Sequence, residues 1–202
     1  MYTVRFQLEL SGSEKRFLSK SFFYANQMHN QLVRYATNRL NALFHDKEYM
    51  GARKAYGEAE YSKKKVSELS ASEKKKKKEL SNIMCIKQKE YNLMKTSLCK
   101  YVSKEQKKYK NYINSHQAQA EAEAVYKGVE KILFEDGRHL HYRRYNSFDC
   151  IKQKCAATGV RLLRWDTICF MKHYFKVHIP EDEYIQNIIS SVDLKEDVVY
   201  PF

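Results

Sequence analysis

The sequence lacks three features that would place it among secreted, membrane-spanning or zinc-ribbon proteins. No two of its five cysteines form a CxxC pair, which favours free thiols in a reduced compartment over a disulfide framework or a paired zinc ribbon. No window approaches the roughly 18 consecutive apolar residues of a membrane-spanning helix. The N-terminus alternates polar and apolar residues and does not have the charged start and apolar run of a signal peptide. We therefore expect a cytoplasmic chain without a membrane partner.

Acidic residues are scarce relative to basic ones. The 202 residues include 37 Lys and Arg against 24 Asp and Glu, which gives a formal net charge of +13. Such a charge favours a polyanionic partner, either nucleic acid or an anionic membrane surface. The 16 Tyr and 10 Phe residues provide flat rings on which bases can stack, whereas a membrane binder would need a marked amphipathic anchor. Nucleic acid is therefore the favoured partner.

The positive charge is concentrated in the first two thirds of the chain. Residues 1–137 contain 27 Lys and Arg against 16 Asp and Glu, whereas residues 138–202 contain 10 against 8. The densest cluster is Lys74–Lys78, and a second cluster interleaves lysines with Tyr109 and Tyr112. A charge run is usually a solvated helix face or a disordered loop, and that interpretation stays open here. The functional interpretation is contact with a phosphate backbone, because the affinity rises with the number of cations involved.

The first 45 residues predict a strand followed by a long helix. Apolar and polar residues alternate over 2–10, as in a strand with one buried face. One strand cannot stand alone, so it must pair with strands beyond residue 138. Ser11 and Glu14 have the spacing of a capping box. The spacing of apolar residues after them predicts a helix whose buried stripe consists of Leu18, Phe22, Ala25, His29, Leu32, Ala36, Leu40 and Leu43.

The middle of the chain predicts three further helices. Residues 46–64 are polar and contain two glycines, which favours a loop or a frayed helix. Ser70 and Glu73 repeat the capping-box spacing and predict a strongly basic helix over 71–89. A helix is predicted from about 95 to 109. The last helix ends near Gly137, and its buried face consists of Ala118, Ala122, Val125, Val129, Ile132 and Leu133.

Short strands are predicted beyond residue 138. Aromatic and β-branched residues are frequent over 140–145, 158–165, 174–180 and 196–202. The order is therefore strand, helices, strands. This order indicates an α+β protein.

Two adjoining stretches carry a resemblance to a known family. "AEAVYKGVEKILFEDG" leads into "HLHYRRYNSFDCIKQKCAATGVRL", and this succession is similar to the passage from the last recognition helix into the wedge domain of TnpB/OrfB-type transposon nucleases, which are related to type V CRISPR effectors. The long helix "FFYANQMHNQLVRYATNRL" after an N-terminal strand fits as well. The matching positions are Val129, Glu130, Lys131, Leu133, Phe134, Gly137, His141, Tyr142, Arg143, Arg144, Tyr145, Ser147, Lys154, Thr158, Gly159, Val160 and Arg161.

The resemblance implies a fold and a set of partners. In that family a small β-barrel, the wedge, carries a large helical insertion between its first and second strands. Residues 1–11 would then be the first wedge strand, 12–137 the helical recognition insertion, and 138–202 the remaining wedge strands. The implied partners are guide RNA and double-stranded DNA, whose backbones the protein grips while base pairing reads the sequence. A separately encoded C-terminal nuclease half is a further partner on this interpretation.

The catalytic part of the family has no counterpart in this sequence. Family members continue into a RuvC-like nuclease with an Asp-containing strand, a Glu, a zinc ribbon and a final Asp. Here the carboxylates of 181–183 are expected on a loop without partners, whereas two-metal cleavage needs clustered carboxylates. We expect a fragment truncated before the nuclease domain that is not an enzyme by itself. Mg²⁺ and structural Zn²⁺ are implied only for the missing part, and no metal or cofactor is expected in this chain.

The expected nucleic-acid-binding residues are basic side chains and one tyrosine: Lys74, Lys75, Lys76, Lys77, Lys78, Lys107, Lys108, Lys110, Arg143, Arg144, Tyr145, Lys152, Lys154 and Arg161. For the residues beyond 138, surface charge and core packing remain equally good interpretations. His139 and His141 alternate on a possible strand, but two histidines without a third ligand more often pack or contact RNA than bind metal. The alternative function is a stand-alone basic helical interaction protein that binds an acidic partner or an anionic surface.

Overall fold

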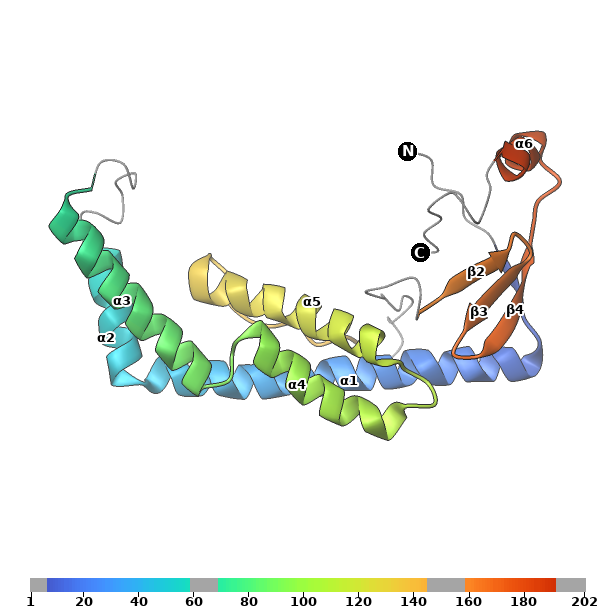
Figure 1. Ribbon diagram of the computed structural model, residues 1–202. Helices are drawn as coiled ribbons and strands as arrows, with labels where there is room; N and C mark the ends of the chain where they lie inside the picture. The colour runs from blue at the N-terminus through green and yellow to red at the C-terminus, as the bar shows by residue number, and fades with distance from the viewer. Residues whose placement is uncertain (1–6, 59–68, 145–158, 192–202) are drawn as a thin grey trace. The chain divides into compact units, whose positions relative to one another are not determined.

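The computed structural model describes residues 7–58, 69–144 and 159–191, and they combine long helices with a small antiparallel sheet (Figure 1). The α+β class is confirmed. The chain forms two compact units. The sheet unit consists of Met1–His29, Val102–Glu121 and Arg143–Phe202, and the helical unit consists of Asn30–Tyr101 and Ala122–Tyr142.

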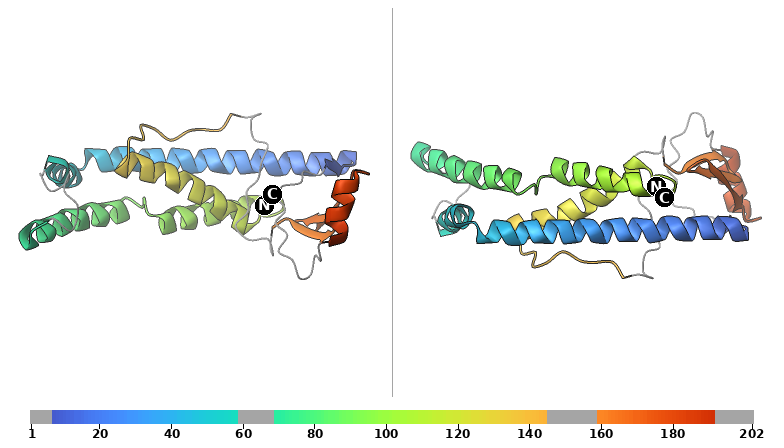
Figure 2. Two further views of the ribbon diagram at one scale, coloured as in Figure 1. Left: turned by 90° about the horizontal axis from the view of Figure 1, so that it is seen from above. Right: turned by 90° about the horizontal axis from the view of Figure 1, so that it is seen from below.

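The first helix, α1 (Gly12–His45), is continuous over 34 residues, as Figure 2 shows from two sides. The expected capping box is present, because the Ser11 amide donates to Glu14 Oε2 at 2.6 Å and the Glu14 amide donates to Ser11 Oγ at 3.3 Å. The stripe predicted from the sequence is also confirmed. From Ala25 onward its members are buried, and Leu18 and Phe22 are half-buried.

Residues 47–58 form helix α2 (Lys47–Glu58), so the prediction of a loop or frayed helix was wrong there. Asp46 begins this helix, because its Oδ1 accepts hydrogen bonds from the amides of Glu48 at 2.9 Å and Tyr49 at 3.0 Å. Gly51 and Gly57 lower helix propensity by up to about 1 kcal/mol each. The cap and the burial of Tyr49 and Ala52 offset that cost.

The next helices follow the sequence pattern closely. They are α3 (Ala71–Glu90), α4 (Lys95–Gln106), the short 3₁₀ turn η3 (Lys107–Tyr109) and α5 (Ser115–Phe134). Ser70 and Glu73 form the second predicted capping box. The predicted face of α5 is buried throughout. After α5 the amide of Gly137 donates to the Lys131 carbonyl at 3.1 Å, and a Cβ at 137 would lie 2.7 Å from the backbone of Lys131, so only glycine fits this close turn.

The sheet contains β1 (Gln7–Glu9), β2 (Arg161–Arg164), β3 (Thr167–Phe170) and β4 (His173–His178) in the order β1-β4-β3-β2, all antiparallel. Gln7 pairs with His178, which confirms that the N-terminal strand pairs with one beyond residue 138. Helices α1 to α5 are therefore inserted between β1 and β2. The described strands form an open sheet.

Several sequence expectations about the C-terminal region need correction. Residues 140–144 form no strand, and the Arg144 carbonyl accepts a hydrogen bond from Asn26 Nδ2 at 3.0 Å. Strand β3 and helix α6 (Glu183–Ser191) were not predicted. Glu181 and Asp182 lie on a loop as expected, but Glu183 is the first residue of α6. Asp182 caps α6 by accepting hydrogen bonds from the amides of Tyr184 and Ile185, so it is not without partners. The predicted strand over 196–202 lies outside the described residues.

The β3–β4 hairpin turns through an unusual pair of residues. Phe170 pairs with His173, so Met171 and Lys172 form a two-residue loop, and both have positive φ angles of 51° and 66°. This conformation usually selects Asn and Gly. The core face of the sheet is covered by Phe17 of α1, whose ring centroid lies 3.9 Å from that of His173 and 6.4 Å from that of Phe175.

Across the described ranges, we find no helix with the combined length and apolar character that a membrane crossing requires.

Candidate nucleic-acid interface

The lysine run occupies the N-terminal half of α3. A helix advances by about 100° per residue, so Lys74–Lys78 point in all directions around it. Lys77 is half-buried and the other four are exposed. Within the part of the chain that the structure describes, none of the five forms an ion pair with a carboxylate. Their charge is therefore available to an external anion.

Three of the five lysines share one face of α3. Lys74, Lys77 and Lys78 line a cavity of about 340 Å³ together with Tyr56 of α2, Leu69 and Ser81. The i, i+3, i+4 spacing places them side by side. Lys77 Nζ lies 5.6 Å from the centroid of the Tyr56 ring, a cation–π contact. Lys75 and Lys76 do not line this cavity.

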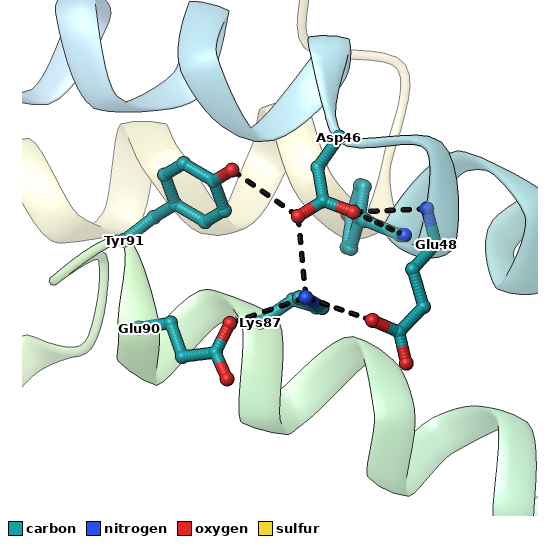
Figure 3. A network of polar contacts seen from close by, with 6 residues as sticks. Asp46, Glu48, Lys87, Glu90 and Tyr91 are labelled. Carbon is teal, nitrogen blue, oxygen red and sulfur yellow. Dashed lines mark hydrogen bonds and ion pairs between the residues drawn. The ribbon is translucent and has the colours of Figure 1, made fainter.

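A different lysine of α3 has an internal role (Figure 3). Lys87 Nζ lies 2.8 Å from Glu48 Oε2 and 3.3 Å from both Asp46 Oδ2 and Glu90 Oε2. These hydrogen bonds, first to Glu48 and then to Glu90, raise the pKa of Lys87 above its usual value. Tyr91 donates its hydroxyl to Asp46 Oδ2 at 3.1 Å. Lys87 therefore joins α2 to α3 and is not available to a ligand.

The second basic cluster is interleaved with tyrosines, as the sequence indicated. Lys107 and Lys110 are exposed, whereas Lys108 Nζ pairs with Glu105 Oε2 at 2.6 Å. Tyr109 and Tyr112 are half-buried, and both contact the ring of Tyr24, with centroids 4.8 Å and 5.0 Å apart. Lys20 Nζ lies 5.9 Å from the Tyr112 centroid. The sheet unit therefore presents lysines around a tyrosine cluster whose faces are partly used in packing.

Arg143 has an internal partner. Its Nη1 lies 2.7 Å from Oε2 of Glu121, a buried residue of α5. His29 Nδ1 lies 2.9 Å from the same oxygen and donates to it. Burial alone would raise the pKa of Glu121, but the hydrogen bond from His29 and the charge of Arg143 outweigh burial and hold the pKa below its usual value. Part of the Arg143 guanidinium is thus committed to neutralising a buried carboxylate.

The remaining expected residues are dispersed. The side chain of Arg144 is exposed. Arg161 is exposed at the start of β2, and its Nη2 donates to Cys169 Sγ at 3.7 Å. Tyr145, Lys152 and Lys154 lie outside the described residues. Lys74–Lys78 belong to the helical unit, whereas the other described candidates belong to the sheet unit.

One face of the sheet carries further basic and aromatic residues that the sequence analysis did not single out. Tyr174, Lys176 and His178 alternate along β4 and are exposed, and Arg161 lies on the same face through its pairing across β3. Glu9 of β1 pairs with Lys176 at 2.8 Å and with His178 at 3.3 Å, which reduces the positive charge there. The period-2 alternation of β4 was the signal that could have identified this face.

Metal-ligating residues are not clustered in the described ranges: no group of three or more His, Cys, Asp or Glu could hold a metal ion there. The exposed rings of His139 and His141 lie 4.5 Å apart, edge to face. Cys85 and Cys169 are free thiols.

Comparison of the chain with protein-family models, with curated proteins and with solved structures finds no match.

Proposed function

We propose that this chain binds nucleic acid through the lysines of α3. The observation that carries the proposal is the absence, among the described residues, of any carboxylate paired with Lys74–Lys78. Only Lys74 lies in the first turn of α3, where the helix dipole disfavours a cation, so the dipole gives the run no stabilising role. A phosphate backbone would supply the missing counter-charges, and three lysines already share one face.

We further propose that the chain is the nucleic-acid-binding part of a TnpB/OrfB-like RNA-guided nuclease. The insertion of helices between β1 and β2 supports it, because the wedge of that family receives its recognition helices at the same point. Closure of the sheet into a barrel, guide RNA and double-stranded DNA as partners, and dependence on a separate nuclease half are parts of this proposal. On this proposal, the chain binds nucleic acid in the cytoplasm and does not cut it.

The salt dependence of binding tests the proposal. We expect the chain to bind structured RNA with an affinity that falls linearly with the logarithm of salt concentration. Each lost phosphate contact changes the slope by about 0.7 to 0.9, so replacement of Lys74, Lys77 and Lys78 by Gln should flatten it by about two units. Replacement of Lys75 and Lys76 by Gln should change the slope less, because these two lysines do not line the shared cavity.

Two results would contradict the proposal. An unchanged slope after all five lysines are replaced would make the run a solvated face. No binding of RNA or DNA at moderate salt would favour the alternative, a basic interaction protein with an acidic partner or an anionic surface.

A further inference from the structure

Two cavities of the helical unit adjoin each other beside α3. The smaller is the one of about 340 Å³ lined by Lys74, Lys77 and Lys78. The larger, of about 940 Å³, is lined by residues of α2 and α3 and by the end of α5. Both are lined by Tyr56 and Ser81, so they adjoin each other at these residues, and we name the pair the α3 groove. The larger cavity lies within the range of roughly 300–1,000 Å³ typical of ligand sites.

The two ends of the α3 groove differ in chemistry. The smaller cavity is cationic through its three lysines. The larger one contains the ring of Phe134, which is 64% exposed, and the thioether of Met84. A large exposed ring beside a cationic pocket matches the two parts of a nucleotide, because phosphate needs cations and a base needs a flat apolar face.

The other charged residues of the groove set a direction for such a ligand. Glu135 and Asp136 line the larger cavity together with Arg53 and Lys131. Two carboxylates and two cations leave that end close to neutral, whereas the lysine end has three cations and no carboxylate among the described residues that line it. The carboxylates can also accept hydrogen bonds from the amino groups of a base. Arg53 is already stacked on Phe44, with Cζ 5.1 Å from the ring centroid. The phosphate is therefore favoured at the lysine end and the base at the Phe134 end.

We propose that the α3 groove binds an unpaired nucleotide of a single strand, with its phosphate on Lys74, Lys77 and Lys78 and its base stacked on Phe134. This inference rests on the proposed function, since it names the form of nucleic acid that the α3 lysines take. A duplex keeps its bases stacked on one another and offers only its backbone to the lysines. An acidic peptide has the charge but need not have the flat ring.

Substitutions of Phe134 test the stacking directly. The full chain is titrated against a labelled ten-nucleotide single strand and against its duplex, with binding followed by fluorescence anisotropy. Phe134→Ala should weaken single-strand binding about tenfold and leave duplex binding unchanged. Phe134→Leu should weaken single-strand binding by the same factor, because leucine keeps the apolar bulk but has no flat face. Phe134→Tyr should bind the single strand as tightly as the parent does. As a control, Ile86→Ala removes an exposed apolar side chain that lies on α3 outside the groove, and it should leave single-strand affinity unchanged.

A spectroscopic variant gives an independent measurement. The chain has a single tryptophan, Trp165, so Phe134→Trp adds one emitter at the groove. A base stacked on it should quench the added fluorescence upon addition of the single strand, and the duplex should not. RNA and DNA strands of one sequence are both titrated; binding by either supports the groove, and the tighter of the two identifies the nucleic acid.

The outcomes separate the inference from the proposed function. Loss of single-strand affinity in Phe134→Ala and Phe134→Leu, but not in Phe134→Tyr, supports both the groove and the lysine proposal. Unchanged single-strand affinity in Phe134→Ala, with duplex binding retained, overturns the groove and leaves the lysine proposal standing. Equal weakening of heparin and single-strand binding also overturns the groove, because heparin has no bases. No binding of any strand to the parent chain overturns the proposed function itself.

Discussion

The two ends of α3 use the same residue type in opposite ways. At the N-terminal end, Lys74–Lys78 have no carboxylate partner among the described residues. At the C-terminal end, Lys87 contacts three carboxylates and lies where the dipole favours it. The difference indicates that Lys87 serves the fold, and it is the reason why we propose a ligand for the lysine run.

Arg143 of the sheet unit is, like Lys87, a cation paired with a carboxylate. It was expected to contact nucleic acid, yet it lies 2.7 Å from the buried Glu121. A buried carboxylate without such partners would be costly, whereas an exposed lysine contributes little to stability. Predictions on stability therefore separate the paired cations from the unpaired ones.

The largest effect is expected at Glu121. Glu121→Gln leaves His29 and Arg143 without their shared charge and should lower the free energy of unfolding at pH 7 by about 2–4 kcal/mol, measured by denaturant titration. Glu123→Gln is a matched control on the same helix, because the pair of Glu123 with Lys95 is half-exposed and should contribute less than about 1 kcal/mol.

The contribution of Glu121 to the free energy of unfolding should decrease at acidic pH. The pKa of Glu121 is lower in the folded chain than its usual 4.5, so its contribution is fully present above about pH 4.5 and is lost as the pH falls through the folded pKa. The difference in free energy of unfolding between the parent and Glu121→Gln should therefore shrink below pH 4.5. Equal stability of the two proteins at pH 7 would refute the role of the buried pair.

An intermediate effect is expected at Lys87. Lys87→Gln leaves Asp46, Glu48 and Glu90 close together without a cation, so the melting temperature should fall by a few degrees, measured by circular dichroism. Because the pKa of Lys87 is raised above 10.5, its contribution is fully present below pH 10.5 and is lost as the pH rises through the folded pKa. Lys76→Gln on the same helix should leave the melting temperature unchanged. Equal shifts in the two variants would remove the distinction between the ends of α3.

The smallest effect concerns a lysine whose backbone matters more than its charge. Lys172 has a φ of 66° and Met171 one of 51°, values that cost less for Gly and Asn. Replacing both residues, Met171→Asn with Lys172→Gly, should raise the free energy of unfolding by about 1 kcal/mol although a cation is lost. Denaturant midpoints check this, and a lower midpoint would show that the native side chains make contacts that outweigh the strain.

Local rules predicted much of the helical part of this fold. The capping boxes at Ser11 and Ser70 and the buried faces of α1 and α5 follow from hydrogen bonding and spacing within a few residues. The same rules failed for α2, because its two glycines predict a loop, whereas the cap at Asp46 and the burial of Tyr49 and Ala52 stabilise a helix. They failed again at β3, because Met171 and Lys172 give no turn signal.

The sequence by itself determined where α1, α3, α4 and α5 lie and where the positive charge is concentrated, since periodicity and net charge are properties of neighbouring residues. Only the tertiary structure decided which cations are available. Glu121 and His29 lie 92 positions apart in the chain, and Lys87 meets Asp46 and Glu48 from another helix. The groove likewise needs Tyr56, Ser81 and Phe134 from three helices. Ion pairs and cavities depend on distances in space, which spacing along a chain does not fix.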